Sequence, residues 1–136
     1  MGTKTTKRQS NRIVITFDDL PYVELRANYH KSNFWAERSS STKLARQEAY
    51  ILGLSYKRFL PDFEPVESCE IEEVFTVDNK LRRDIEGLMY GCKAFIDGLV
   101  DAGILVDDSW KHVRKLTGGI VFKKGYRKTE IIITEV

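Results

Sequence analysis

The sequence predicts an α+β fold, in which a small mixed sheet and two main helices form a single domain. The chain has 136 residues, of which 42% are hydrophobic and 11% aromatic, so it can build one core and does not have the composition of a disordered chain. Segments rich in β-branched residues predict strands, and two segments with apolar residues at helical spacing predict helices. The clearer helix lies between predicted strands, which favours a mixed α+β arrangement.

The first two strands are predicted from β-branched residues and from alternation. Residues 12–17, RIVITF, are rich in β-branched side chains and end at a DDLP turn signal. Residues 69–77 alternate between apolar and polar side chains, although Glu73 interrupts the apolar face. Both segments therefore predict strands that present one face to a core.

Two helices are predicted. Residues 22–38 show no clean period and predict an irregular loop, whereas residues from about 42 to 54 carry apolar side chains at helical spacing, after N-cap candidates at Ser39–Ser41. The second helix has a single apolar stripe, and Gly103 is placed to end it. The stripe consists of Leu88, Cys92, Phe95, Ile96, Leu99 and Val100.

The last third of the chain predicts two more strands around a turn. Strand-forming residues occupy 110–116, a Gly118-Gly119 pair predicts a turn, and residues 129–136 are strongly β-prone. A basic segment, KKGYRK at 123–128, precedes the final strand. The principal helix is thus expected between strands of one sheet.

The chain is divided into a flexible basic N-terminal tail, residues 1–11, and one folded domain, residues 12–136. It contains no apolar run of the roughly 18 residues that a membrane span requires, and no apolar signal core follows the basic N-terminus. Its two cysteines, Cys69 and Cys92, lack CxxC spacing, which favours a reducing compartment. We therefore expect a soluble, cytoplasmic protein with no membrane association and no organic cofactor.

Charge is segregated along the chain although the net charge is only +2. Residues 1–60 hold 11 basic and 5 acidic side chains, residues 61–110 hold 4 and 13, and residues 111–136 hold 7 and 2. Such runs can simply be solvated faces. Alternatively, the acidic middle is a site for a divalent metal, flanked by surfaces that bind phosphate.

Acidic pairs stand before and after the second helix, and a lysine lies inside it. Asp84 and Glu86 precede the apolar stripe, Asp107 and Asp108 follow Gly103, and Lys93 lies between the two pairs. Mg²⁺ prefers carboxylate oxygens and keeps several waters, so such acids could bind the ion and leave coordination positions for a phosphate. The acids can meet only if the chain folds back after Gly103.

Each of these residues also has a purely structural interpretation. Asp84 can be an N-cap, and Glu86 a first-turn acid that complements the helix dipole. Asp107 and Asp108 can belong to a turn, and Lys93 can be an exposed helix position. Spacing alone leaves both interpretations open.

The strings RDIEGL at 83–88, with Lys93, and DGLVDAGILVDDS at 97–109 resemble the RusA family of Holliday junction resolvases. This resemblance implies a RusA-like endonuclease domain, homodimers, and Mg²⁺-dependent paired nicking of four-way DNA, with Mn²⁺ able to substitute. It implies a catalytic lysine at Lys93, a basic residue at Arg83 before the first acid, and metal-binding acids. Those acids would be Asp84, Glu86, Asp107 and Asp108, of which Asp84, Glu86 and Asp108 would be catalytic.

The sequence departs from the family pattern at two positions. Glu86 stands where the family has aspartate, and Gly87 stands where it has asparagine. Glutamate keeps the charge but moves the carboxylate by about 1 Å, which can cost roughly a hundredfold in rate if nothing compensates. Glycine removes a side chain that could orient an acid or a phosphate.

The favoured hypothesis is therefore a crossover junction endodeoxyribonuclease that hydrolyses phosphodiester bonds in branched DNA. Basic side chains would grip backbone phosphates without recognising bases. The candidates are Arg26, Arg38, Lys43, Arg46, Arg83, Lys123, Lys124, Arg127 and Lys128. The alternative is a non-catalytic module that binds branched or duplex DNA, and a third hypothesis is an interaction protein that never meets DNA.

Overall fold

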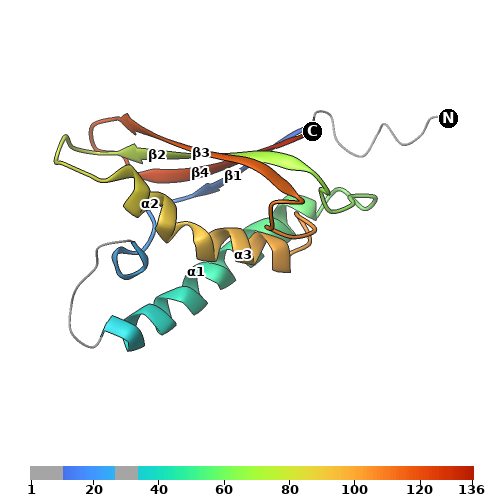
Figure 1. The fold of residues 1–136 in the computed structure, drawn as a ribbon, viewed down its shortest axis with the longest axis horizontal. Helices are drawn as coiled ribbons and strands as arrows, with labels where there is room; N and C mark the ends of the chain where they lie inside the picture. Colours follow the sequence, from blue (N-terminus) through green and yellow to red (C-terminus); the bar gives the residue numbers. More distant parts are fainter. Residues whose placement is uncertain (1–10, 27–33) are drawn as a thin grey trace.

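The structure is a computed structural model that describes residues 11–26 and 34–136 of the chain (Figure 1). The predicted flexible tail, residues 1–11, lies outside this part of the chain except for Asn11. Asn11 already belongs to the sheet region, because its backbone carbonyl accepts a hydrogen bond of 2.8 Å from the Glu135 N–H.

Four strands form one mixed sheet in the order β1-β4-β2-β3. The central strand β4 pairs antiparallel with β1 on one side and with β2 on the other, whereas β2 and β3 are parallel. The strands are β1 (Arg12–Phe17), β2 (Cys69–Val77), β3 (Val113–Phe122) and β4 (Lys128–Glu135). The predicted α+β fold with a small mixed sheet is confirmed.

The helices lie on one side of the sheet (Figure 1). They are the short 3-10 helix η2 (Val23–Leu25) and the α-helices α1 (Phe34–Lys57), α2 (Ile85–Gly91) and α3 (Lys93–Asp101). Helix α3 contacts the sheet through Phe95, whose ring stacks on Phe17 of β1 with 3.9 Å between centroids. In the described part of the chain, no helix is both long enough and apolar enough to cross a membrane.

Helix α1 is longer than predicted. It begins at Phe34 rather than near residue 42, so the predicted irregular loop is wrong over residues 34–38, and residues 27–33 lie outside the described chain. The serines expected to cap the helix lie inside it. The reason is tertiary: Ser41 is buried, with 6% of its surface exposed, and this packing against the rest of the fold outweighs the weak helix propensity of serine.

The predicted second helix is two helices that meet at Cys92. The Cys92 N–H donates to the Met89 carbonyl at 3.0 Å, a tight turn that separates α2 from α3. Gly103 ends α3 as expected, with φ +78°. Its N–H donates to the Val100 carbonyl, and the Ile104 N–H donates to the Leu99 carbonyl, which together form a Schellman cap.

The predicted turn at Gly118-Gly119 is wrong, because both glycines lie within β3. The turn between β3 and β4 instead contains Gly125, with φ +75°. Gly118 is needed for packing rather than for a turn: a β-carbon there would lie 2.5 Å from the Met89 Sδ atom. The missing side chain thus lets α2 approach the sheet.

Candidate functional site

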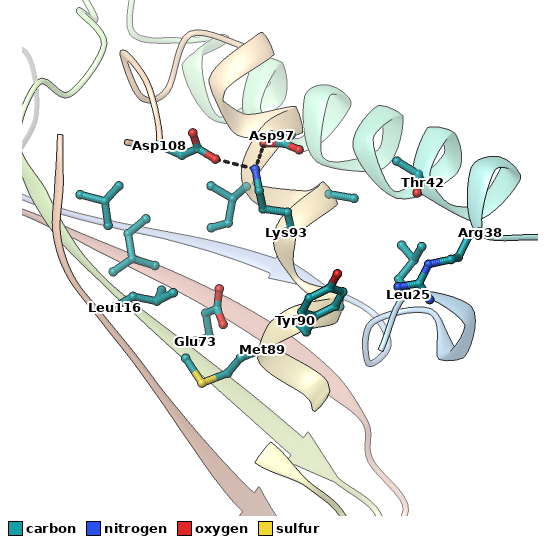
Figure 2. A pocket seen from close by; sticks show the side chains of 15 residues that line it. Leu25, Arg38, Thr42, Glu73, Met89, Tyr90, Lys93, Asp97, Asp108 and Leu116 are labelled. Carbon is teal, nitrogen blue, oxygen red and sulfur yellow. Dashed lines mark hydrogen bonds and ion pairs between the residues drawn. The ribbon is translucent and has the colours of Figure 1, made fainter. Parts of the chain in front are cut away.

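A pocket of about 530 Å³ lies between β2, β3 and helices α1, α2 and α3 (Figure 2). Its walls are mainly apolar, with a few polar groups in the same space. The apolar residues include Leu25, Ile71, Met89, Ile96, Val113 and Leu116, and the polar ones are Arg38, Thr42, Glu73, Tyr90, Lys93, Asp97 and Asp108. A largely apolar pocket with few polar groups is typical of a binding site.

Lys93 joins two carboxylates at the rim of this pocket. Its Nζ atom lies 2.8 Å from Asp97 Oδ1 and 2.8 Å from Asp108 Oδ2 (Figure 2). Asp97 lies one helical turn after Lys93 on α3, where i and i+4 side chains face each other. The structure therefore brings together Lys93 and Asp108, two residues predicted for one site.

The chain path after α3 explains how Asp108 reaches Lys93. The Schellman cap at Gly103 reverses the chain, and the returning segment then pairs with Val66. The Val66 N–H donates to the Ile104 carbonyl at 2.9 Å, and the Val106 N–H donates to the Val66 carbonyl at 3.0 Å. Asp108 follows two residues later, and its own N–H donates to the Asp107 carboxylate at 2.8 Å.

Lys93 and Asp108 stabilise each other's ionised forms. The hydrogen bonds that Lys93 donates, to Asp108 first and then to Asp97, raise the pKa of its ammonium. The hydrogen bond from Lys93 lowers the pKa of the Asp108 carboxyl. At neutral pH the cluster therefore holds one positive and two negative charges, and it attracts cations.

Glu73 is a site residue that the sequence analysis did not include. It lies on the core face of β2 with 1% of its surface exposed, and its Oε1 atom has no hydrogen-bond partner among the residues that the structure describes. Burial raises the pKa of its carboxyl to about 8, so the group is mostly neutral at pH 7. Figure 2 shows it beside Met89 and Leu116, in the apolar part of the pocket. The sequence feature that could have indicated Glu73 as a pocket residue is its position on the otherwise apolar face of β2.

Asp97 was also missed as a site residue, although it lies inside the string that resembles RusA. Its spacing of four residues from Lys93 was the available signal. The predicted acids at the start of α2 behave differently. Asp84 is the N-cap of α2, where its Oδ1 accepts a 3.1 Å hydrogen bond from the Glu86 N–H.

Asp84, Glu86 and Asp107 are exposed, and none of them lines the pocket. Within residues 11–26 and 34–136, no group of three or more His, Cys, Asp or Glu side chains is close enough to hold a metal ion. The predicted set of four acids is therefore not gathered around one ion position here. The N-cap interpretation of Asp84 is the one that the structure displays.

Comparison of this chain with known protein families and with curated proteins finds no match. The resemblance to RusA therefore rests on the sequence motif alone.

Three of the predicted DNA-binding arginines, Arg26, Arg83 and Arg127, are close enough for their charges to interact. Burial, followed by the positive charges of Arg83 and Arg127, lowers the pKa of Arg26. Arg26 donates to the Pro21 carbonyl at 2.9 Å. Arg83 donates to the Asn79 carbonyl at 3.1 Å, and Arg127 pairs with Asp19 at 3.0 Å.

The other predicted DNA-binding residues are more scattered. Arg46 of α1 forms a bidentate pair with Asp101 of α3, in which one of the bonds is 2.9 Å long, so its charge is already matched. Arg38 donates to the Glu24 carbonyl at 2.7 Å and lies over the Tyr90 ring at the pocket. Four further lysines are distributed over α1 and the region of the β3–β4 turn. Lys123 and Lys128 lie over the Tyr126 ring, and Lys43 and Lys124 are exposed.

Proposed function

We propose that this protein is a Mg²⁺-dependent, structure-selective endodeoxyribonuclease. It nicks four-way or related branched DNA, and it acts as a homodimer so that two strands meet two equivalent sites. The observation that supports the proposal is the Lys93 cluster, in which Asp108 and Asp97 both hydrogen-bond Lys93 at the rim of a pocket. Lys93 and Asp108 are residues that the RusA resemblance assigns to one catalytic site.

The charge of the cluster favours a cation as a partner. One ammonium and two carboxylates sum to a negative charge, which repels a DNA phosphate unless a cation lies between them. Mg²⁺ is often held by one or two carboxylates together with waters and substrate phosphates. Asp97 and Asp108 would supply those carboxylates, and Mn²⁺ could take the same place. When bound, the ion would polarise a phosphoryl oxygen and make a bound water more acidic.

Lys93 would bind the phosphate directly. Its ammonium is held by two acids, so it is oriented before DNA arrives, and such preorganised charge is effective where negative charge develops. The grouped arginines, Arg26, Arg83 and Arg127, would hold backbone phosphates nearby. Contacts of this kind make binding strongly dependent on salt.

A nicking assay on a synthetic four-way junction tests the proposal. We expect cleavage with Mg²⁺, none with EDTA, and a large loss with Asp108→Asn. Asp62→Asn, at an exposed loop position, is the matched control and should cleave like the unmodified protein. Absence of cleavage at every Mg²⁺ and Mn²⁺ concentration would contradict the proposed activity.

A second candidate function is a non-catalytic module that binds branched or duplex DNA. The observation that favours it is the position of Asp84, whose carboxylate caps α2 instead of joining the acidic cluster. Tight, salt-sensitive binding to the junction without any cleavage would support this candidate.

A further inference from the structure

We propose that the pocket beside the Lys93 cluster receives one unpaired nucleobase of the branched DNA. Glu73 would hydrogen-bond the edge of that base as a combined donor and acceptor. This inference rests on the proposed function, and it names the part of the substrate that the site selects.

The pocket has the character that a nucleobase requires. A volume of about 530 Å³ is within the range of small-molecule pockets, and Ile71, Met89 and Leu116 supply apolar walls. Tyr90 lies at the same pocket with 59% of its surface exposed, and a base can stack on the side of its ring that Arg38 does not cover. Stacking of a base on an aromatic ring tolerates any sequence, because every base has a flat face.

The charged rim is suited to the rest of the nucleotide. Lys93, Asp97 and Asp108 line the same pocket as Glu73, but Figure 2 shows them grouped on one side of it. A phosphate held at this rim leaves its attached base free to enter the apolar part. Enzymes that act on DNA bases often use such pockets, and extrusion costs least where the base is already unpaired.

Glu73 supplies the polar contact inside the apolar part. It is 1% exposed, and within residues 11–26 and 34–136 its Oε1 atom has no hydrogen-bond partner, which is unfavourable for a buried polar group unless a ligand completes it. A neutral carboxyl group has one donor and one acceptor side by side. Each of the four bases has an adjacent donor and acceptor on its pairing edge. Glu73 therefore selects an unpaired base rather than a particular sequence.

The test uses four-way junctions that carry one extra nucleotide at the branch point, either an unpaired thymidine or an abasic residue. Binding is measured in Ca²⁺ to prevent cleavage. We expect the unmodified protein to bind the thymidine junction about tenfold more tightly than the abasic one. Glu73→Leu should abolish this preference, while Glu73→Gln should keep it, because glutamine also presents a donor beside an acceptor.

Two further variants separate the base contact from a role in folding. Glu72→Leu changes the exposed neighbour of Glu73 and should retain the full preference. Tyr90→Ala, at an exposed position, should reduce the preference without preventing junction binding.

Equal affinity of the unmodified protein for the two junctions overturns the base pocket and leaves the nuclease proposal standing. Loss of the preference in Glu73→Gln as well as in Glu73→Leu also overturns it, since a carboxylate would then be required. If no branched DNA binds at low salt, both proposals are wrong.

Discussion

Two acidic regions of this molecule, both in the strings that resemble the RusA family, differ in what their carboxylates bind. At the start of α2, the Asp84 carboxylate binds a backbone N–H of its own helix. At the start of α3, Lys93 holds Asp97 and Asp108, which are separated in sequence, beside a pocket. The tight turn at Cys92 lies between the two regions, so helical spacing counted from Asp84 does not continue to Lys93. The comparison teaches that residues of one motif meet where the path of the chain brings them together, as the return after Gly103 does for Asp108, and not because of their spacing alone.

The largest expected effect on the nicking rate is the difference between two single variants, each of which removes one charge from one of the two regions. Asp108→Asn should lower the rate of junction nicking about 1000-fold, because the carboxylate belongs to the Lys93 cluster. Asp84→Asn should lower it less than fivefold, because asparagine caps a helix as well as aspartate does. Single-turnover nicking rates give both values. A loss of the same size in Asp84→Asn would show that the two regions act as one site.

Lys93→Met should lower the nicking rate about 100-fold while the affinity for the junction changes little. Binding depends on many phosphate contacts, so the loss of one cation changes the affinity little. Cleavage depends on this one ammonium, so its loss lowers the rate strongly. Lys80→Met, in the loop before α2, is a control that removes an exposed cation elsewhere. An equal loss of cleavage and of affinity in Lys93→Met would indicate a binding role alone.

Glu73 should make the free energy of unfolding depend on pH. Its carboxyl has a pKa of about 8 in the folded protein, against an ordinary value of 4.5. The folded state keeps this proton between those pH values and the unfolded state does not. The free energy of unfolding should therefore fall as pH rises through this range, by up to about 1.4 kcal/mol per pH unit from this group. Below pH 4.5 the contribution is fully present.

Urea unfolding at pH 5 and pH 8 measures this effect. Glu73→Gln should flatten the pH dependence, because the amide does not titrate, whereas Glu72→Gln should leave it unchanged. Equal slopes for the unmodified protein and Glu73→Gln would contradict the assignment of a buried, protonated Glu73.

The smallest expected effect concerns the α2 region. Asp84→Ala should lower the free energy of unfolding by about 1 kcal/mol through loss of the cap, and Asp84→Asn should change it by only a few tenths. Thermal unfolding in the absence of DNA measures both. No difference between the two variants would mean that the cap contributes little to the fold.

Strands and helix ends were predicted correctly where residues close together in the sequence determine them. The β-branched segment of β1 and the alternation in β2 gave correct strands, and Gly103 gave a correct helix end. The predicted elements were wrong where contacts between distant parts of the chain determine the secondary structure. Gly118 resembles a turn residue in sequence, but it is required because Met89 lies against it.

The candidate site was predictable only in part. The spacing left open whether Lys93 and Asp108 meet, since this required a return of the chain after Gly103, and only the RusA resemblance implied that they share a site. The position of that return depends on hydrogen bonds with Val66, which lies far away in the sequence. Glu73 could be noticed as an acid on an apolar face, but its place in the pocket depends on how α2 and β3 cover β2.

The contact between Met89 and Gly118 also makes the site sensitive to oxidation. The Met89 sulfur packs where a β-carbon on Gly118 would have no room, and Met89 lines the pocket. Conversion to the sulfoxide would add a polar oxygen to this tight apolar contact and push α2 away from β3. Peroxide should therefore inactivate the protein, methionine sulfoxide reductase should restore it, and Met89→Leu should resist the treatment.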